Sequence, residues 1–417
     1  MKRAPAEPLY YALELLLSTP TWVVMSIYLV AELDLSPLQL VLMGTAMEAT
    51  VFLFEVPTGV LADTYSRRLS LTIGFLGMGV AWLLVGVVSA PAAIVALWAA
   101  WGISYTFTSG AYQAWITDEV GVDRVGVVFL RGARFAYVGA LLGLIGFVAL
   151  GTVSLRAAVV ASGAVTVAGG LACLLLMPET GFGRRPKEER AGALAELRTT
   201  AVNGGRFVRA QPVLILLIGI ALVGGMSSEA FDRLKEAHFI RDVGLPAIGG
   251  FDAVVWFGAF SAVAMVFGFF VLGRLQKRFE RVGSAGLAKL LLAFTAVMIG
   301  GLLCYALTGS AAVAIVALLA VLLTRGVVYP LWETWVNEQI TDSSVRATVI
   351  SITGQADAIG QTAGGPVLGA IGNVWGIRAA LTTGALVLLP ALGLYGRAIA
   401  HGGKEPELEE LPDPVEA

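Results

Sequence analysis

The stretch that decides the fold occurs twice in this chain. It reads Gly110-Ala-Tyr-Gln-Ala-Trp-Ile-Thr-Asp-Glu-Val120 and then, 220 residues later, Pro330-Leu-Trp-Glu-Thr-Trp-Val-Asn-Glu-Gln-Ile340. At this offset aromatic matches aromatic, Trp matches Trp and acid matches acid, in the pairs Tyr112 and Trp332, Trp115 and Trp335, and Asp118 and Glu338. Each copy follows a long apolar run. The recurrence therefore predicts two related halves.

The composition indicates a membrane protein. Apolar residues make up 57% of the 417 residues and charged residues only 14%, against about 25% charged in soluble domains. The 50 glycines suit membrane helices, where small residues let backbones approach closely. A net charge of −2 without a basic run argues against nucleic acid as a partner.

Apolar runs predict the number of spans. A helix needs about 20 mostly apolar residues to cross a bilayer, and the runs of that length lie near 10–31, 36–62, 70–89, 92–117, 127–150, 155–177, 212–231, 251–273, 284–308, 311–337, 347–371 and 375–397. We therefore expect an all-α integral membrane protein with twelve transmembrane helices. Six spans separate the two repeated stretches, which predicts two six-helix bundles related by a parallel pseudo-two-fold repeat.

The basic residues predict the orientation. With the N-terminus in the cytoplasm, 21 of the 28 Lys and Arg residues fall on the cytoplasmic side and 5 on the other, with 2 inside spans. Cytoplasmic loops of membrane proteins carry this excess. We expect a multi-pass protein of the cell membrane with both termini in the cytoplasm. The predicted parts are bundles over 1–177 and 212–399, a cytoplasmic central loop over 178–211, and a disordered acidic tail over 400–417.

A loop after the second run carries a family resemblance. Gly59-Val-Leu-Ala-Asp63-Thr-Tyr-Ser-Arg67-Arg68 resembles the signature loop of the major facilitator superfamily, whose fold would cover nearly the whole chain. The resemblance implies that Gly59, Asp63, Arg67 and Arg68 form a cytoplasmic gate, with Asp63 near the positive N-terminal end of the eleventh span. The family pattern usually has Arg just after the Asp and Gly just before the basic pair, where this chain has Thr64 and Ser66. In the second half, Arg274 stands where the pattern has an acid. A basic loop that only sets the topology is the alternative.

The preceding residues resemble one group within that family. The stretch Phe54-Glu-Val-Pro-Thr-Gly-Val-Leu-Ala-Asp63 is similar to drug:proton antiporters and multidrug efflux proteins. Such antiporters carry a Pro-containing glycine motif on the fifth span, whereas here the fifth span has glycines without Pro. The nearest similar stretch, Gly360–Gly369, lies on the eleventh span. The direction of transport is therefore left open.

Several ionisable residues lie inside the predicted spans. Burying a charge in a bilayer is costly, so each is a candidate for proton coupling or substrate binding; they are Glu14, Glu48, Glu55, Arg325, Glu333 and Asp357. The acids could carry protons because burial favours the neutral form. Arg325 could keep one acid ionised or bind an anionic substrate. Fixed ion pairs, or positions at the membrane interface, are the alternatives. The resemblance places the first, fourth, seventh and tenth helices around the cavity.

Aromatic residues and a charged cluster add further candidates. The aromatic residues Tyr105, Tyr112, Trp115, Trp332 and Trp335 would suit a flat apolar or cationic substrate if they line the cavity; helix packing is the alternative. At the outer end of span seven, Glu229 and Asp232 lie beside Arg233 and Lys235. They form either a solvated rim or an extracellular gate.

The resulting function prediction is secondary transport. We expect proton-coupled export of small amphipathic molecules or drugs by alternating access, in a monomer whose partners are the substrate, protons and the lipid bilayer. Uptake by symport or facilitated diffusion is the alternative, and a non-transporting scaffold a remote one. No nucleotide loop, HExxH or Ser/His/Asp set indicates an enzyme. No cofactor or metal is expected, since His238 and His401 are far apart and Cys173 and Cys304 lie in apolar runs.

Overall fold

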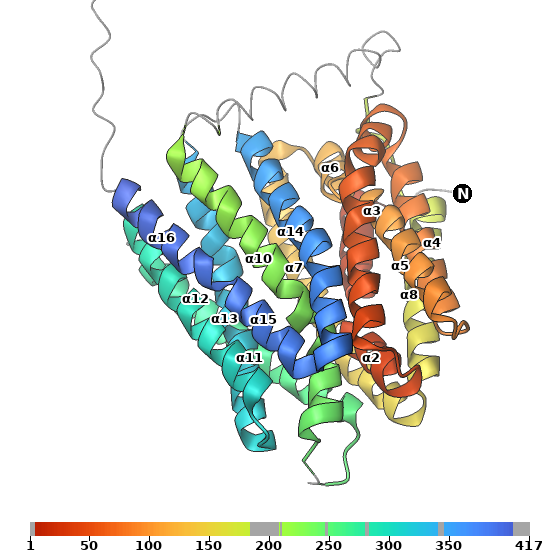
Figure 1. The fold of residues 1–417 in the computed structure, drawn as a ribbon. Helices are drawn as coiled ribbons and strands as arrows, with labels where there is room; N and C mark the ends of the chain where they lie inside the picture. The colour runs from red at the N-terminus through yellow and green to blue at the C-terminus, as the bar shows by residue number, and fades with distance from the viewer. Residues whose placement is uncertain are drawn as a thin grey trace, which may run out of the picture.

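The computed structural model describes residues 5–183, 208, 211–246, 249–279, 283–340 and 346–402. Over these residues the chain is helical without strands (Figure 1). The first half contains α1 (Ala6–Leu17), α2 (Trp22–Ile27), the π-helix η1 (Tyr28–Glu32), α3 (Pro37–Thr64), α4 (Arg67–Val85), α5 (Pro91–Thr106), α6 (Ala111–Val120), α7 (Val122–Val153) and α8 (Leu155–Leu176). The second half contains α10 (Pro212–His238), the π-helix η2 (Phe239–Val243), α11 (Ala253–Phe279), α12 (Ser284–Leu307), α13 (Ala311–Gln339), α14 (Arg346–Trp375), α15 (Ile377–Val387) and α16 (Leu389–Gly402).

The predicted spans correspond to these helices. In the described part of the chain, ten helical stretches are long and apolar enough to cross a membrane. The other two predicted runs are α11, whose apolar part is Ala253–Gly268, and α14, where Gln355, Asp357 and Gln361 lower the hydropathy. The all-α membrane fold with two six-helix bundles is confirmed. The predicted central loop and tail lie mostly outside the described residues.

Two spans in the first half are broken rather than continuous. Between α1 and α2, Pro20 has no N–H to donate and forces the preceding residue out of helical conformation. The hydroxyl of Thr21 then caps the first turn of α2 by accepting from the Val23 N–H. Between α5 and α6, Gly110 has φ of +69°, which glycine adopts without steric cost. The spans predicted over 10–31 and 92–117 are therefore present, each with an interruption of the helix.

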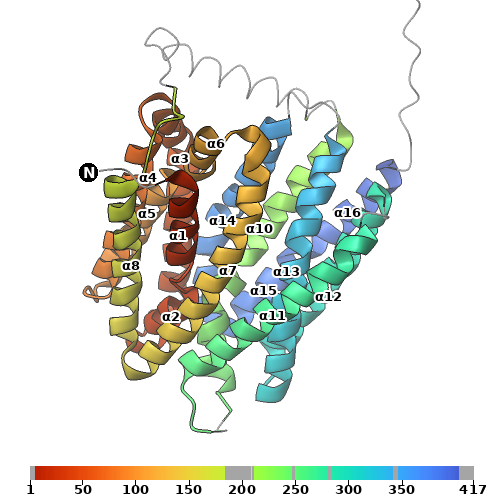
Figure 2. The same cartoon turned by 180° about the vertical axis from the view of Figure 1, so that it is seen from behind.

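Three hydrophobic cores determine how the halves meet. One core lies within the first half, around Trp115, and another within the second half, around Trp335. The third core contains residues of both halves, among them Val41 of α3 and Leu368 of α14. Each separate core lies toward the end of the molecule that bears Arg67, which we call the Arg67 face. The shared core lies toward the opposite end, the Asp34 face. The helices accordingly diverge toward the Arg67 face (Figures 1 and 2).

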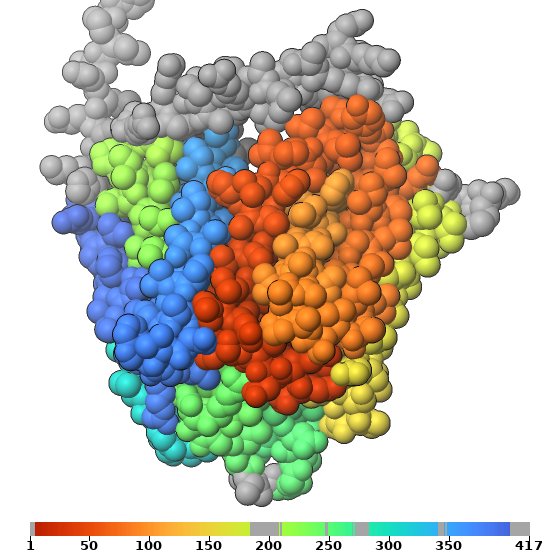
Figure 3. All heavy atoms as spheres, turned by 45° about the vertical axis from the view of Figure 1, so that its right-hand side comes forward, coloured from red at the N-terminus to blue at the C-terminus, as the bar shows by residue number. Residues whose placement is uncertain are grey.

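The shared core forms a closed seam because small residues let the helices touch. A Cβ at Gly369 would lie 3.1 Å from Leu38, and one at Gly372 would lie 2.8 Å from Pro37. The Asn373 side-chain oxygen also accepts from the Leu38 N–H at 3.1 Å. Figure 3 shows α14 in contact with α3 along this seam. The two halves are therefore joined at the Asp34 face.

Candidate functional site

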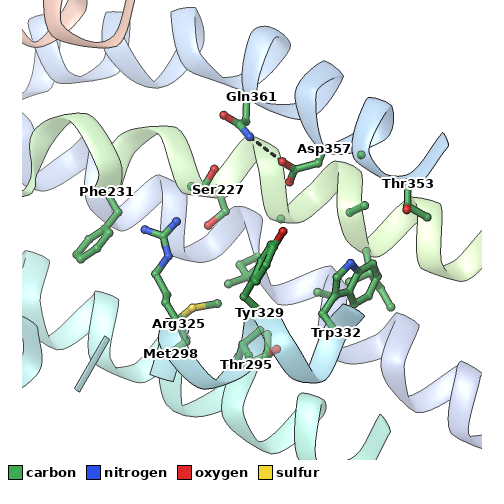
Figure 4. Close-up of a pocket in the computed structure, with 18 of the residues that line it drawn as sticks. Ser227, Phe231, Thr295, Met298, Arg325, Tyr329, Trp332, Thr353, Asp357 and Gln361 are labelled. Carbon is green, nitrogen blue, oxygen red and sulfur yellow. Dashed lines mark hydrogen bonds between the residues drawn. The ribbon is translucent and has the colours of Figure 1, made fainter. Parts of the chain in front are cut away.

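One cavity lies within the second half, and we call it the C-terminal cavity. Its volume is about 680 Å³, within the range of small-molecule sites. Helices α10, α12, α13, α14 and α16 supply its walls (Figure 4). The wall combines aromatic and thioether groups with polar ones, including Phe231, Asp232, Met298, Arg325, Tyr329, Trp332, Glu333, Asp357, Gln361 and Tyr395. Such a surface can bind a molecule that has both flat apolar and polar parts.

Arg325 is paired with Asp232, which the sequence placed in the charged cluster at the outer end of span seven. Its Nη2 donates to Asp232 Oδ2 at 2.8 Å, and its Nη1 contacts the other carboxylate oxygen. The guanidinium also lies 5.5 Å from the centre of the Phe231 ring. A two-point contact of this kind fixes the geometry of both charges. The positive charge of Arg325 is therefore balanced by Asp232 of α10, not by Asp357 or Glu333.

Two acids of the cavity have no basic partner. Asp357 accepts a hydrogen bond of 2.6 Å from the Gln361 amide, and Figure 4 shows both side chains beside the open space. Glu333 lies on the wall one turn beyond Tyr329. In the described part of the chain, neither carboxylate has a Lys or Arg nitrogen within 4.0 Å. The cavity thus holds three carboxylates and one guanidinium, an excess of two acids.

A smaller cavity of about 300 Å³ lies in the first half, and we call it the N-terminal cavity. Glu14 lies on its wall with Tyr105 and Tyr112. Residues of both helix breaks, Ser18 and Gly110, also line it. Irregular backbone at membrane depth is tolerated where it borders a cavity, which explains why the two breaks meet here. Glu14, Tyr105 and Tyr112 are thus brought together.

The aromatic residues divide between cavities and cores. Trp332 lines the C-terminal cavity. Trp115 is 1% exposed, and its indole N–H donates to the Pro178 carbonyl at 2.9 Å. Trp335 is 2% exposed and packs on Tyr395 with ring centres 5.7 Å apart. The prediction of a cavity position is wrong for Trp115 and Trp335, because burying each large ring in its own bundle stabilises that bundle.

The two acids of α3 lie apart from the cavity walls. Glu48 is half-buried, one turn from Gly44 at the seam. Glu55 is exposed and accepts from the Ser109 hydroxyl at 3.2 Å. Neither residue lines the C-terminal or the N-terminal cavity. Glu48 and Glu55 therefore lie outside the wall that carries Asp357 and Glu333.

The loop between α3 and α4 is organised around Arg67. The Arg67 guanidinium contacts Asp63 and, from Nε, Asp118 at 3.3 Å. The Glu179 carboxylate accepts hydrogen bonds from the Arg68 backbone N–H at 3.1 Å and from the Ser66 hydroxyl. A Cβ at Gly59 would meet nothing within 4 Å. All these partners belong to the first half, since the halves diverge at this face. The expected contact of Asp63 with the start of α14 is absent from the described residues.

Span seven is longer than predicted, and this explains why Phe231 and Asp232 were not predicted to line the cavity. The helix continues from Pro212 to Val243, about three turns beyond the expected end at 231. Glu229 is 1% exposed and lies 3.6 Å from Arg233, so the solvated-rim interpretation is wrong for it. Glu229 pairs with Arg233 and Glu236 pairs with Lys235, which lets the turns stay buried. The placement of Arg233 four residues after Glu229, one helical turn on, is the signal that could have indicated this.

Comparison with known proteins identifies the family. A model of the Major Facilitator Superfamily matches residues 9–356. The uncharacterized MFS-type transporter YxaM of Bacillus subtilis (strain 168) is 24% identical over 394 residues, with 90% of each chain covered. The solved structure of the nucleoside transporter NupG has a TM-score of 0.73 at 12% identity, and the match covers 96% of this chain and 98% of NupG.

A bacterial homologue of the human lysosomal transporter Spinster has the same fold. Its inward-facing, unoccupied structure gives a TM-score of 0.71 at 15% identity and covers 94% of this chain and 95% of the homologue. At these identities the likeness concerns the fold alone. Together with the family match over most of the sequence, it establishes that this chain is a membrane transporter belonging to the Major Facilitator Superfamily.

Proposed function

We propose that this protein exports small amphipathic molecules in exchange for protons, by alternating access. The observation that carries the proposal is the excess of acids in the C-terminal cavity, where Arg325 already has Asp232 as its partner. Among the described residues, Asp357 and Glu333 have no Lys or Arg nitrogen within 4.0 Å. An ionised acid in a bilayer is costly unless it is paired or wetted. Either a proton or a positively charged substrate relieves that cost, and the two would compete.

The wall of the cavity supports an amphipathic substrate. Tyr329 and Trp332 present ring faces on the same helix as Glu333. Aromatic faces attract both flat apolar groups and cations. With two carboxylates nearby, the preferred occupant is an aromatic molecule that carries a positive charge.

The arrangement of the halves supports alternating access. The molecule is joined at the Asp34 face and divergent at the Arg67 face, which by the distribution of basic residues we assign to the cytoplasm. In this state a cytoplasmic molecule reaches the cavity. Opening the seam at the Asp34 face would release it outside. Glu48, beside that seam, and Asp357, in the cavity, are the proposed proton-coupling acids.

Uptake by symport is the competing function, and the direction of flux separates the two. Inside-out vesicles containing the protein are given a proton gradient with an acidic interior, in the presence of ethidium, a flat aromatic cation. Export by antiport predicts accumulation of ethidium inside the vesicles, whereas symport predicts the opposite dependence on the gradient. Glu48→Gln or Asp357→Asn should abolish accumulation. Asp123→Asn, at an exposed acid at the start of α7, is the matched control; full proton-driven transport in both test variants would refute their role.

A further inference from the structure

One contact that holds the seam closed is made by a single arginine. At the Asp34 face, Arg241 of the second half reaches into the turn that joins the first two spans. Its Nη2 donates to the carbonyls of Val30 at 3.1 Å and Leu35 at 3.0 Å, and to the Asp34 carboxylate at 2.8 Å. We call these four residues the Arg241 latch.

The latch is a helix cap supplied by the other half of the molecule. The π-helix η1 ends at Glu32, so its last carbonyls have no partner within the helix and carry partial negative charge. Asp34 has φ of +46°, the one positive value for a non-glycine residue in the described part of the chain. This uncommon conformation turns the chain so that carbonyls and carboxylate surround one cation. Separating the halves at this face must break the latch.

Arg241 is positioned by a buried histidine on the preceding turn. The His238 side chain is 0% exposed. Its Nδ1 lies 2.9 Å from Asp242 Oδ2, and its Nε2 lies 3.0 Å from the Tyr305 carbonyl oxygen. Both neighbours are hydrogen-bond acceptors. A neutral imidazole has a single N–H and can satisfy only one of them, whereas the charged ring donates from both nitrogens.

We propose that His238 and Asp242 bind a proton of their own, and that this proton keeps the Arg241 latch closed. With the proton, the ring ties η2 to α12 through two hydrogen bonds and holds Arg241 toward the first half. Without the proton, one ring nitrogen of His238 has only a lone pair facing an oxygen, and one of the two hydrogen bonds is lost. A buried polar group left without its partner destabilises its surroundings, here the short segment that carries the latch.

The other charged groups around the ring already have partners. On α10, Lys235 lies 3.1 Å from Glu236. From α15, Arg378 donates to the carbonyls of Leu307 and Asp242, each at 3.2 Å.

The phenol of Tyr305, on α12, donates to the Lys235 carbonyl at 2.6 Å. On the α11 side, Phe257 and Phe260 pack against Phe239 of η2. In the described part of the chain Asp242 is therefore the acid in direct contact with the ring, and the two residues form a self-contained proton site. The site is separate from Asp357 and Glu333 and does not depend on their role.

Opening of the Asp34 face can be followed by the distance between two spin labels. Ser89 precedes α5 and Ser310 precedes α13, and both are exposed at this face, one in each half. Ser89→Cys and Ser310→Cys are introduced into a chain in which Cys173 and Cys304 are replaced by Ala. Double electron–electron resonance then measures the open and closed populations between about pH 5 and pH 8, where histidine normally changes charge. The open-to-closed ratio should rise with pH by up to tenfold per unit, the limit for one proton.

Two variants separate the proton from the latch. In Asp242→Asn the amide N–H can donate to Nδ1 of a neutral ring, whose Nε2–H still donates to Tyr305; the seam should stay closed at every pH. Arg241→Gln removes the latch, and the seam should be open at least tenfold more often at every pH. A wild type without pH dependence, or an unchanged slope in Asp242→Asn, would overturn the proposal. Asp357→Asn should keep the wild-type slope; a lost slope there would assign the effect to the cavity.

A direct readout does not require the Asp242→Asn and Arg241→Gln variants to fold. The chain has two histidines, so His401→Gln leaves His238 as the sole source of histidine signals in a ¹⁵N-labelled sample. When the seam is closed, the ring should show protons on both nitrogens. A single neutral tautomer in that state would contradict the double donation from the ring.

Discussion

Arg325 and Asp232 face each other on the wall of the C-terminal cavity, with Nη2 2.8 Å from Oδ2 and each side chain 35% exposed. Asp232→Asn leaves a guanidinium without its partner. We expect a loss of about 1–3 kcal/mol in stability, seen as a lower Tm in detergent. The double variant Asp232→Asn with Arg325→Gln should recover part of that loss. Strictly additive losses would show that the two groups do not interact.

The two tryptophans of α13 should respond differently to truncation. Trp332→Ala removes a cavity wall and should weaken binding of an aromatic cation about tenfold, roughly 1.4 kcal/mol, with little change in Tm. Trp335→Ala empties a core position and should cost about 3–5 kcal/mol of stability. The protein that still folds should bind the probe normally. Tryptophan fluorescence quenching and thermal unfolding measure the two effects, and a reversed pattern would move the binding site.

The seam should be sensitive to a single methyl group. A Cβ at Gly372 of α14 would lie 2.8 Å from the Cβ of Pro37 at the start of α3, and the proline ring cannot swing aside. Gly372→Ala should shift the equilibrium toward an open Asp34 face, by the roughly 1–3 kcal/mol typical of overpacking. The Ser89 and Ser310 label pair reports the shift. Gly146→Ala is the matched control, because a Cβ there meets nothing within 4 Å.

The loop around Arg67 should matter for transport more than for stability. Asp63 is half-exposed and pairs with Arg67 inside the first half, and exposed ion pairs contribute about 0.2–1 kcal/mol. Asp63→Asn should therefore change the Tm little. If Asp63 meets the start of α14 when the Arg67 face closes, the same variant should slow ethidium transport at least tenfold. Equal transport by variant and wild type would contradict the gate and show that the loop only sets the membrane topology.

The orientation can be tested by labelling intact cells. Val122 lies at the Arg67 face, and Ser310 lies at the Asp34 face. In a chain without native cysteines, a membrane-impermeant maleimide should label Ser310→Cys from outside and label Val122→Cys only after lysis. The opposite result would invert the assignment of the faces.

Much of the fold could be predicted from the sequence because membrane spans are recognised by the length and composition of their apolar runs. The runs near 36–62 and 155–177 match α3 and α8 closely. Interruptions were harder to predict. Pro20 and Gly110 lie inside apolar runs, and hydropathy does not register the backbone change that each one causes.

The candidate site was harder to predict because pairing depends on tertiary structure. Nothing in the sequence around Arg325 indicates that its partner is Asp232, 93 residues earlier. This pairing was missed because the charged residues after 231 were taken to lie outside span seven. The burial of Trp115 and Trp335 likewise follows from how each bundle packs, which helical spacing alone does not determine.

The shared core has a consequence for how the polypeptide is held together. Each bundle keeps its own interior around Trp115 or Trp335, and the two adhere through interdigitated side chains at one end only. Such packing does not require a covalent tether. Halves synthesised as separate polypeptides should therefore find each other in the bilayer and rebuild a working carrier.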